Sequence, residues 1–96
     1  MINATKLRFM FQNQQEFKIE VSGIGNRKIQ LYFFKNGGTF DGGSTEVMQN
    51  SHYLFFLHRE EGYVMQSGSV RDCCKFKYSD LQECELNEIL QLRSNK

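Results

Sequence analysis

The sequence predicts a mainly β fold of the α+β class, either a curled antiparallel sheet of five or six strands or a partly open barrel, with one C-terminal helix. Three observations predict it. Apolar and polar residues alternate with a period of two over much of the chain, glycine-containing turns separate these segments, and a helical period emerges only near the end. At 96 residues the chain makes a single domain. We expect strands over 5–12, 16–22, 28–35, 52–58, 63–67 and 74–78, and a helix over 80–93.

The first two predicted strands carry apolar residues at every second position, as in a sheet with one wet face. These positions are Leu7, Phe9, Phe11, Phe17, Ile19 and Val21. The short polar segment 13–15 between them favours a hairpin. A pairing in which opposed residue numbers sum to 28 places Phe11 opposite Phe17 and keeps both apolar faces together.

The third predicted strand, 28–35, is apolar on both faces. Ile29, Leu31 and Phe33 belong to the core face, whereas Tyr32 and Phe34 point outward. A strand with two apolar faces is covered on both sides, by a helix, a loop or another subunit. The segment 36–43, with four glycines, then reads as a loop with tight turns.

The second half contains the most hydrophobic segment, 52–58, and its predicted hairpin partner, 63–67. Glu60, Glu61 and Gly62 fit a three-residue hairpin loop with Gly62 at a positive φ. A last strand over 74–78 precedes a helix over 80–93, for which Ser79 and Gln82 make a capping box and the leucines share one face.

The charge balance argues against a strongly basic domain, because twelve Lys and Arg face eleven Asp and Glu, a formal net charge of +1. The three cysteines, two of them adjacent, do not make a disulfide framework and favour free thiols in a reducing compartment. There is no signal-peptide pattern and no apolar run long enough to cross a membrane. We therefore expect a cytoplasmic protein that does not contact membranes.

No catalytic, metal or cofactor constellation emerges from the spacing. His52 and His58 would lie about 20 Å apart on one extended strand, too far to share an ion. Cys73 and Cys74 lack the spacing of a zinc site. The glycine-rich segment lacks the Lys-Ser/Thr ending of a phosphate-binding loop. The sequence thus predicts neither an enzyme nor a bound cofactor.

The aromatic surplus is the best functional signal. The leading hypothesis is a non-enzymatic interaction module that forms a homodimer through excess apolar surface, for which the candidate residues are Tyr32, Phe34, Tyr53, Phe55 and Phe56. An alternative is an OB-like binder of single-stranded nucleic acid, in which the contacts would be Arg27, Lys28, Tyr32, Phe34 and Lys35. Another protein partner, or a small ligand inside a barrel, is a further possibility.

The segments His52–Leu57, Glu61–Tyr63, Ser67–Ser69 and Phe76–Lys77 together resemble a pattern of small bacterial β-barrel proteins of unassigned function. More distantly, they are similar to the OB-like barrel of netrin and TIMP-like modules. That resemblance implies a barrel, but it carries over no inhibitory residue, because Met1 stands where such inhibitors have a cysteine. A short chain of this kind also looks like the product of a mobile gene cassette.

Overall fold

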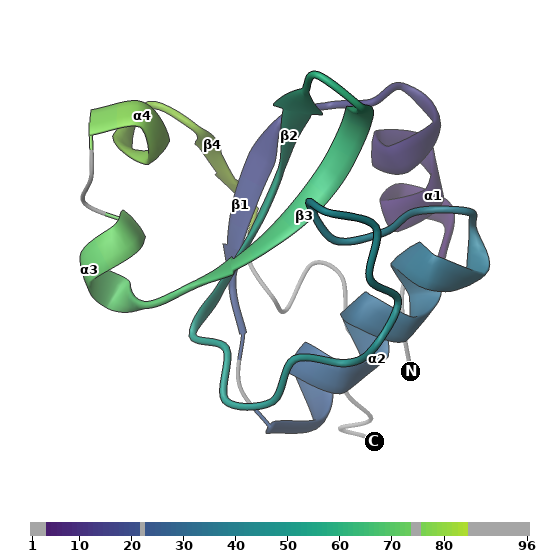
Figure 1. Ribbon diagram of the computed structural model, residues 1–96, viewed down its shortest axis with the longest axis horizontal. Coiled ribbons are helices and arrows are strands. Elements are labelled where there is room, and N and C mark those ends of the chain that lie inside the picture. The colour runs from purple at the N-terminus through teal and green to yellow at the C-terminus, as the bar shows by residue number, and fades with distance from the viewer. Residues whose placement is uncertain (1–3, 22, 74–75, 85–96) are drawn as a thin grey trace.

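Figure 1 presents the computed structural model of the chain, which describes residues 4–21, 23–73 and 76–84. The described residues form α1 (Ala4–Gln12), β1 (Phe17–Glu20), α2 (Gly23–Lys35), β2 (Tyr53–Arg59), β3 (Gly62–Gly68), α3 (Val70–Cys73), α4 (Phe76–Ser79) and β4 (Gln82–Cys84). The chain combines helices with a single sheet, so the predicted α+β class is confirmed.

The sheet is four-stranded and mixed, with the order β3-β2-β1-β4. β2 pairs antiparallel with both β1 and β3, whereas β4 runs parallel to β1. The prediction of a mainly β fold with five or six strands, curled or closed toward a barrel, is therefore wrong, because helices and four strands share the described residues and the sheet is not closed. The predicted antiparallel direction holds for two of the three strand pairs and is wrong for β4. Three of the segments expected to extend the sheet, 5–12, 28–35 and the described part of 74–78, lie in helices instead.

Three predicted strands are confirmed. The segments 16–22, 52–58 and 63–67 contain or overlap β1, β2 and β3. The β2–β3 hairpin turns between Arg59 and Gly62, which pair with each other, so its loop is one residue shorter than expected. Gly62 adopts the predicted positive φ, 122°, a conformation that side chains with a Cβ rarely adopt.

The first predicted strand, 5–12, is wrong, because these residues lie in α1. Leu7, Met10 and Phe11 have the i, i+3, i+4 spacing of one helical face, and all three are buried. Phe9, assigned to the same strand face as Leu7, is instead 62% exposed. The predicted hairpin with 16–22 is consequently wrong too, and Phe17 pairs with Phe56 of β2.

The third predicted strand, 28–35, lies in α2. Ile29 and Phe33, one helical turn apart, are buried against the sheet, and Gln30 beside them is fully buried. Tyr32 and Phe34 flank this buried stripe and are partly exposed. Leu31, predicted for the core face, is instead 43% exposed. The other apolar residues of the predicted strand lie on one broad side of a helix.

The predictions for the C-terminal part are also corrected where the structure describes it. Residues 76–78 lie in α4 and not in a strand, and residues 82–84 form β4 and not a helix. The backbone of β4 pairs with β1, with Phe17 opposite Gln82, and this pairing overrides the local helical pattern. Residues 74–75 and 85–93 of these two predictions lie outside the described residues.

The core has a cluster on each face of the sheet. On one face, α1 and α2 pack against β1 and β2, and the rings of Phe17 and Phe56 stack with centroids 4.7 Å apart. On the other face, Tyr78 of α4 stacks on Phe55 at 4.4 Å. The ammonium of buried Lys18 donates to the carbonyl oxygens of Tyr78 and Ser79, which ties α4 to β1.

Candidate nucleic-acid interface

The two longer helices carry basic side chains and no acidic ones. Within α1 and α2 the charged residues are Lys6, Arg8, Arg27, Lys28 and Lys35. The eleven Asp and Glu of the chain all lie elsewhere in the sequence. Although the net charge of the whole chain is small, all charged side chains of α1 and α2 are therefore positive.

α2 presents its cations as a stripe along its exposed side. Arg27, Lys28 and Lys35 are exposed, and Leu31, between them, is 43% exposed. At 1.5 Å per residue the stripe extends about 12 Å along the helix axis. The opposite side of the helix is fixed by buried Ile29 and Phe33, so the cations face away from the sheet.

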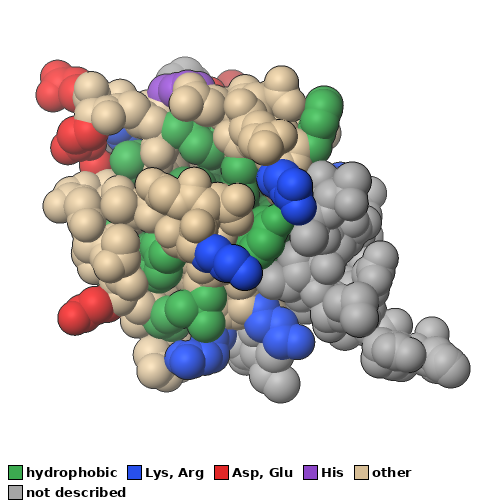
Figure 2. All heavy atoms as spheres, turned by 90° about the vertical axis from the view of Figure 1, so that its right-hand side faces the viewer, with side chains coloured by type: hydrophobic (Ala, Val, Ile, Leu, Met, Phe, Trp, Pro, Cys, Tyr) green, Lys and Arg blue, Asp and Glu red, His purple; other side chains and the backbone are tan. Residues whose placement is uncertain are grey.

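Figure 2 looks onto the side of the molecule that α1 and α2 form. Lys and Arg side chains lie across the middle and lower part of this face, with hydrophobic side chains between them. The acidic side chains visible in this view lie toward its left and upper edges. Basic and apolar groups therefore alternate over the helices, and the carboxylates stay at the margin.

Polar side chains on the inner side of α2 hold the helix against the long loop that follows it. The side-chain amide of Gln30 accepts from the backbone N–H of Met48 at 2.7 Å and donates to the Met48 carbonyl at 2.9 Å. Asn26 donates to the same carbonyl at 3.0 Å. These bonds attach α2, which carries the cationic stripe, to the loop around Met48.

The structure brings the five predicted nucleic-acid contacts onto α2, but it gives them different roles. Arg27, Lys28 and Lys35 are exposed, as a phosphate contact requires. The ring of Tyr32 lies 6.2 Å from Phe11, and the ring of Phe34 lies 5.7 Å from that of Phe40. Both aromatic rings thus pack partly within the protein, which leaves the cations as the accessible groups.

The remaining predicted surface residues are buried. Tyr53 is 8%, Phe55 1% and Phe56 0% exposed, and they lie in the two core clusters on either face of the sheet. The aromatic surplus of β2 is thus covered by the helices of the same chain. Arg8 of α1 was not anticipated as part of a basic face, although the absence of Asp and Glu from residues 4–12 and 23–35 is visible in the sequence.

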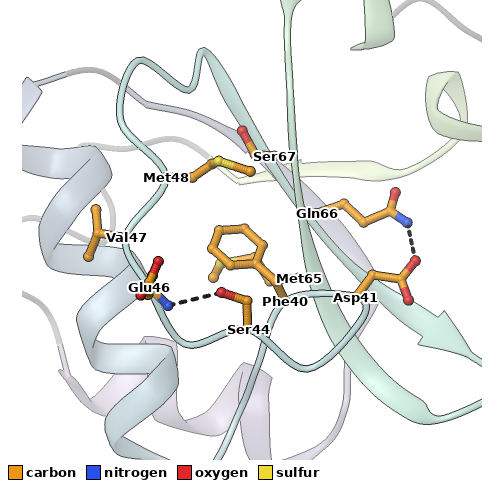
Figure 3. A pocket seen from close by; sticks show the side chains of 9 residues that line it. All are labelled: Phe40, Asp41, Ser44, Glu46, Val47, Met48, Met65, Gln66 and Ser67. Atoms are coloured by element: carbon orange, nitrogen blue, oxygen red, sulfur yellow. Dashed lines mark hydrogen bonds between the residues drawn. The ribbon is translucent and has the colours of Figure 1, made fainter.

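A pocket of about 490 Å³ opens at the outer edge of β3 (Figure 3). The loop between α2 and β2 forms one side of it, since residues 39–41 bond to the β3 edge through both the N–H and the carbonyl of Met65. His52 and His58 lie before β2 and near its far end, as expected from their spacing. Within the described part of the chain, no three His, Cys, Asp or Glu side chains gather as metal ligands would.

Comparison with known proteins adds no relative: no family, no curated protein and no solved structure matches the chain. Among the residues that the structure describes, no helix is long and apolar enough to cross a membrane.

Proposed function

We propose that this chain is a small, non-enzymatic binding module that contacts the phosphate backbone of nucleic acid through α1 and α2. One observation carries the proposal: the two helices that cover one face of the sheet contribute five Lys and Arg residues and no carboxylate. Partly covered aromatic rings favour contacts to phosphates over stacking on bases.

The near-neutral charge of the chain is compatible with this function. At physiological salt, charges more than about 8 Å apart across solvent are largely screened from each other. A phosphate close to the stripe of α2 therefore experiences mainly Arg27, Lys28 and Lys35. Affinity should depend strongly on salt, because each neutralised phosphate releases condensed counterions.

Fluorescence anisotropy with a labelled DNA duplex, titrated between about 50 and 200 mM salt, tests the proposal. If the exposed cations Arg8, Arg27, Lys28 and Lys35 each neutralise a phosphate, the plot of log K against log salt has a slope of about −3 to −4. The double variant Lys28→Gln, Lys35→Gln should reduce the steepness by nearly 2.

Arg71→Gln is the matched control, because Arg71 is an exposed cation on α3, away from the two basic helices. It should leave both affinity and slope unchanged. Absence of binding at the lowest salt, or an equal loss in the control variant, refutes the proposal. Binding to anionic vesicles in preference to DNA refutes it as well.

A second candidate function is self-association as a homodimer, favoured by Phe9. This ring is the most exposed of the large hydrophobic side chains described, at 62%. It lines a hollow of about 270 Å³ with Lys6 and Met10 of α1 and with β4, the last strand of the described sheet. A second copy seated here would cover Phe9.

Light scattering at micromolar concentrations tests the dimer. We expect twice the monomer mass for the unmodified chain, loss of the dimer in Phe9→Ser, and retention in the control Leu31→Ser, which changes another exposed apolar residue. A concentration-independent monomer rules out this second function. Both functions fit a cytoplasmic location, where the three thiols stay reduced.

A further inference from the structure

The pocket beside β3 has an apolar floor and a polar rim. Phe40 and Met65 form the floor and are almost completely buried, whereas Met48 is 52% exposed. In Figure 3 the ring of Phe40 and the Met65 side chain lie at the centre, and Met48 and Ser67 lie at one end. A volume of about 490 Å³ falls within the usual range for small-molecule sites, roughly 300–1,000 Å³.

The charges of the lining all have one sign. Asp41 and Glu46 are the charged members, and no Lys, Arg or His lines the pocket. The other polar groups are the hydroxyls of Ser44 and Ser67 and the amide of Gln66. An anionic ligand would therefore find no cation in the lining to pair with.

Both carboxylates keep free acceptor capacity. The Oδ2 atom of Asp41 accepts from the Gln66 amide at 2.8 Å and lies 3.9 Å from Nε of Arg59, while Oδ1 has no bond to a described residue. The Glu46 carboxylate has none on either oxygen; only its backbone N–H is used, in a bond to Ser44. A carboxylate accepts up to about four hydrogen bonds. Asp41 is turned toward Gln66 and already paired with Arg59, so the open acceptor for a cationic donor is the Glu46 carboxylate.

We infer that this pocket binds a small organic cation, an ammonium or guanidinium group on an apolar body. The apolar body fits the floor of Phe40 and Met65, and the exposed thioether of Met48 adapts to its shape. The cationic group pairs with the Glu46 carboxylate, because Asp41 already forms an ion pair with Arg59. The pocket shares no residue with the cationic stripe, so this inference is independent of nucleic-acid binding.

Three probes of one shape and different charge test the inference: benzylammonium, benzyl alcohol and benzoate. Amide NMR spectra of isotope-labelled protein report both affinity and location. We expect benzylammonium to shift the amides of residues 40–48 and 65–67, and to bind up to about fivefold more tightly than benzyl alcohol, the effect of one exposed ion pair. Benzoate should bind most weakly.

Glu46→Gln should remove most of the preference for the cation, and since Glu46 is exposed, the variant keeps the fold. Glu61→Gln is the control, because Glu61 is an equally exposed carboxylate in the β2–β3 turn. Equal affinity for benzylammonium and benzyl alcohol overturns the inference. So do shifts confined to other residues, or the absence of shifts at about 10 mM probe, a concentration that half-saturates a site with a Kd of about 10 mM.

Discussion

Replacing Gln30 by leucine should destabilise the fold by about 3 kcal/mol, although leucine has a similar size. Gln30 is fully buried, and its amide makes three hydrogen bonds: to Asn26 Oδ1 at 2.6 Å and to the N–H and carbonyl of Met48. Leucine leaves the Met48 N–H and the Asn26 oxygen without this partner, at about 1–3 kcal/mol each. Burial of the leucine side chain offsets about 1–2 kcal/mol of that loss.

Urea unfolding followed by circular dichroism measures the effect, because the chain contains no tryptophan to serve as a fluorescent probe. A loss of about 3 kcal/mol corresponds to a fall in Tm of roughly 10–25 °C for a domain of this size. Gln12→Leu is the control, since Gln12 is an exposed helical glutamine of α1. If the two variants differ by less than about 0.5 kcal/mol in the free energy of unfolding, the hydrogen bonds of the Gln30 amide do not stabilise the fold.

Two other predictions concern stability. Burial, and secondarily the nearby Glu16 carboxylate, raise the pKa of Tyr63 well above its usual value, so the folded state keeps this proton where the unfolded chain has lost it. The contribution of Tyr63 to the free energy of unfolding should be constant below about pH 10 and should fall above it by at most about 1.4 kcal/mol per pH unit. Tyr63→Phe should remove that slope when urea unfolding is measured at a series of alkaline pH values. Gly38→Ala should cost about 1–3 kcal/mol, because a Cβ there would lie 2.4 Å from the Phe33 ring. Gly42→Ala, which adds a Cβ in open space at a φ of 104°, should cost only its backbone strain, about 1 kcal/mol, and an equal loss in both variants would contradict the steric argument.

The strands were predictable where alternation and burial agreed. β2 and β3 surround a turn with Gly62, and both faces of β2 are buried, so a continuous apolar run was a sufficient signal. The helices were missed because short apolar patterns fit two periods at once. Leu7 and Phe11 satisfy alternation as well as the i, i+4 spacing of a helix, and it is the exposure of Phe9 and the burial of Met10 that separate the two.

The part of the candidate site on α2 was predictable in its residues, but Lys6 and Arg8 of α1 and the helical geometry were not. Arg27, Lys28 and Lys35 were named as one group, and a helix holds them together more closely than a strand would. Gln30 interrupts the apolar side of α2 in the sequence. Its burial has no local signal, because its hydrogen-bond partner is the backbone of Met48 in a distant loop. The pocket beside β3 had no local signal, since it forms only when that loop pairs with the strand edge.

The central position of β1 in the sheet has a consequence for synthesis. β1 is synthesised before both of the strands that flank it, since Phe17 pairs with Phe56 on one side and with Gln82 on the other. At about 5–20 residues per second, β1 waits roughly 3–13 seconds for its last partner. During that interval only α1, α2 and later β2 can cover its apolar side chains and prevent their contact with other nascent chains.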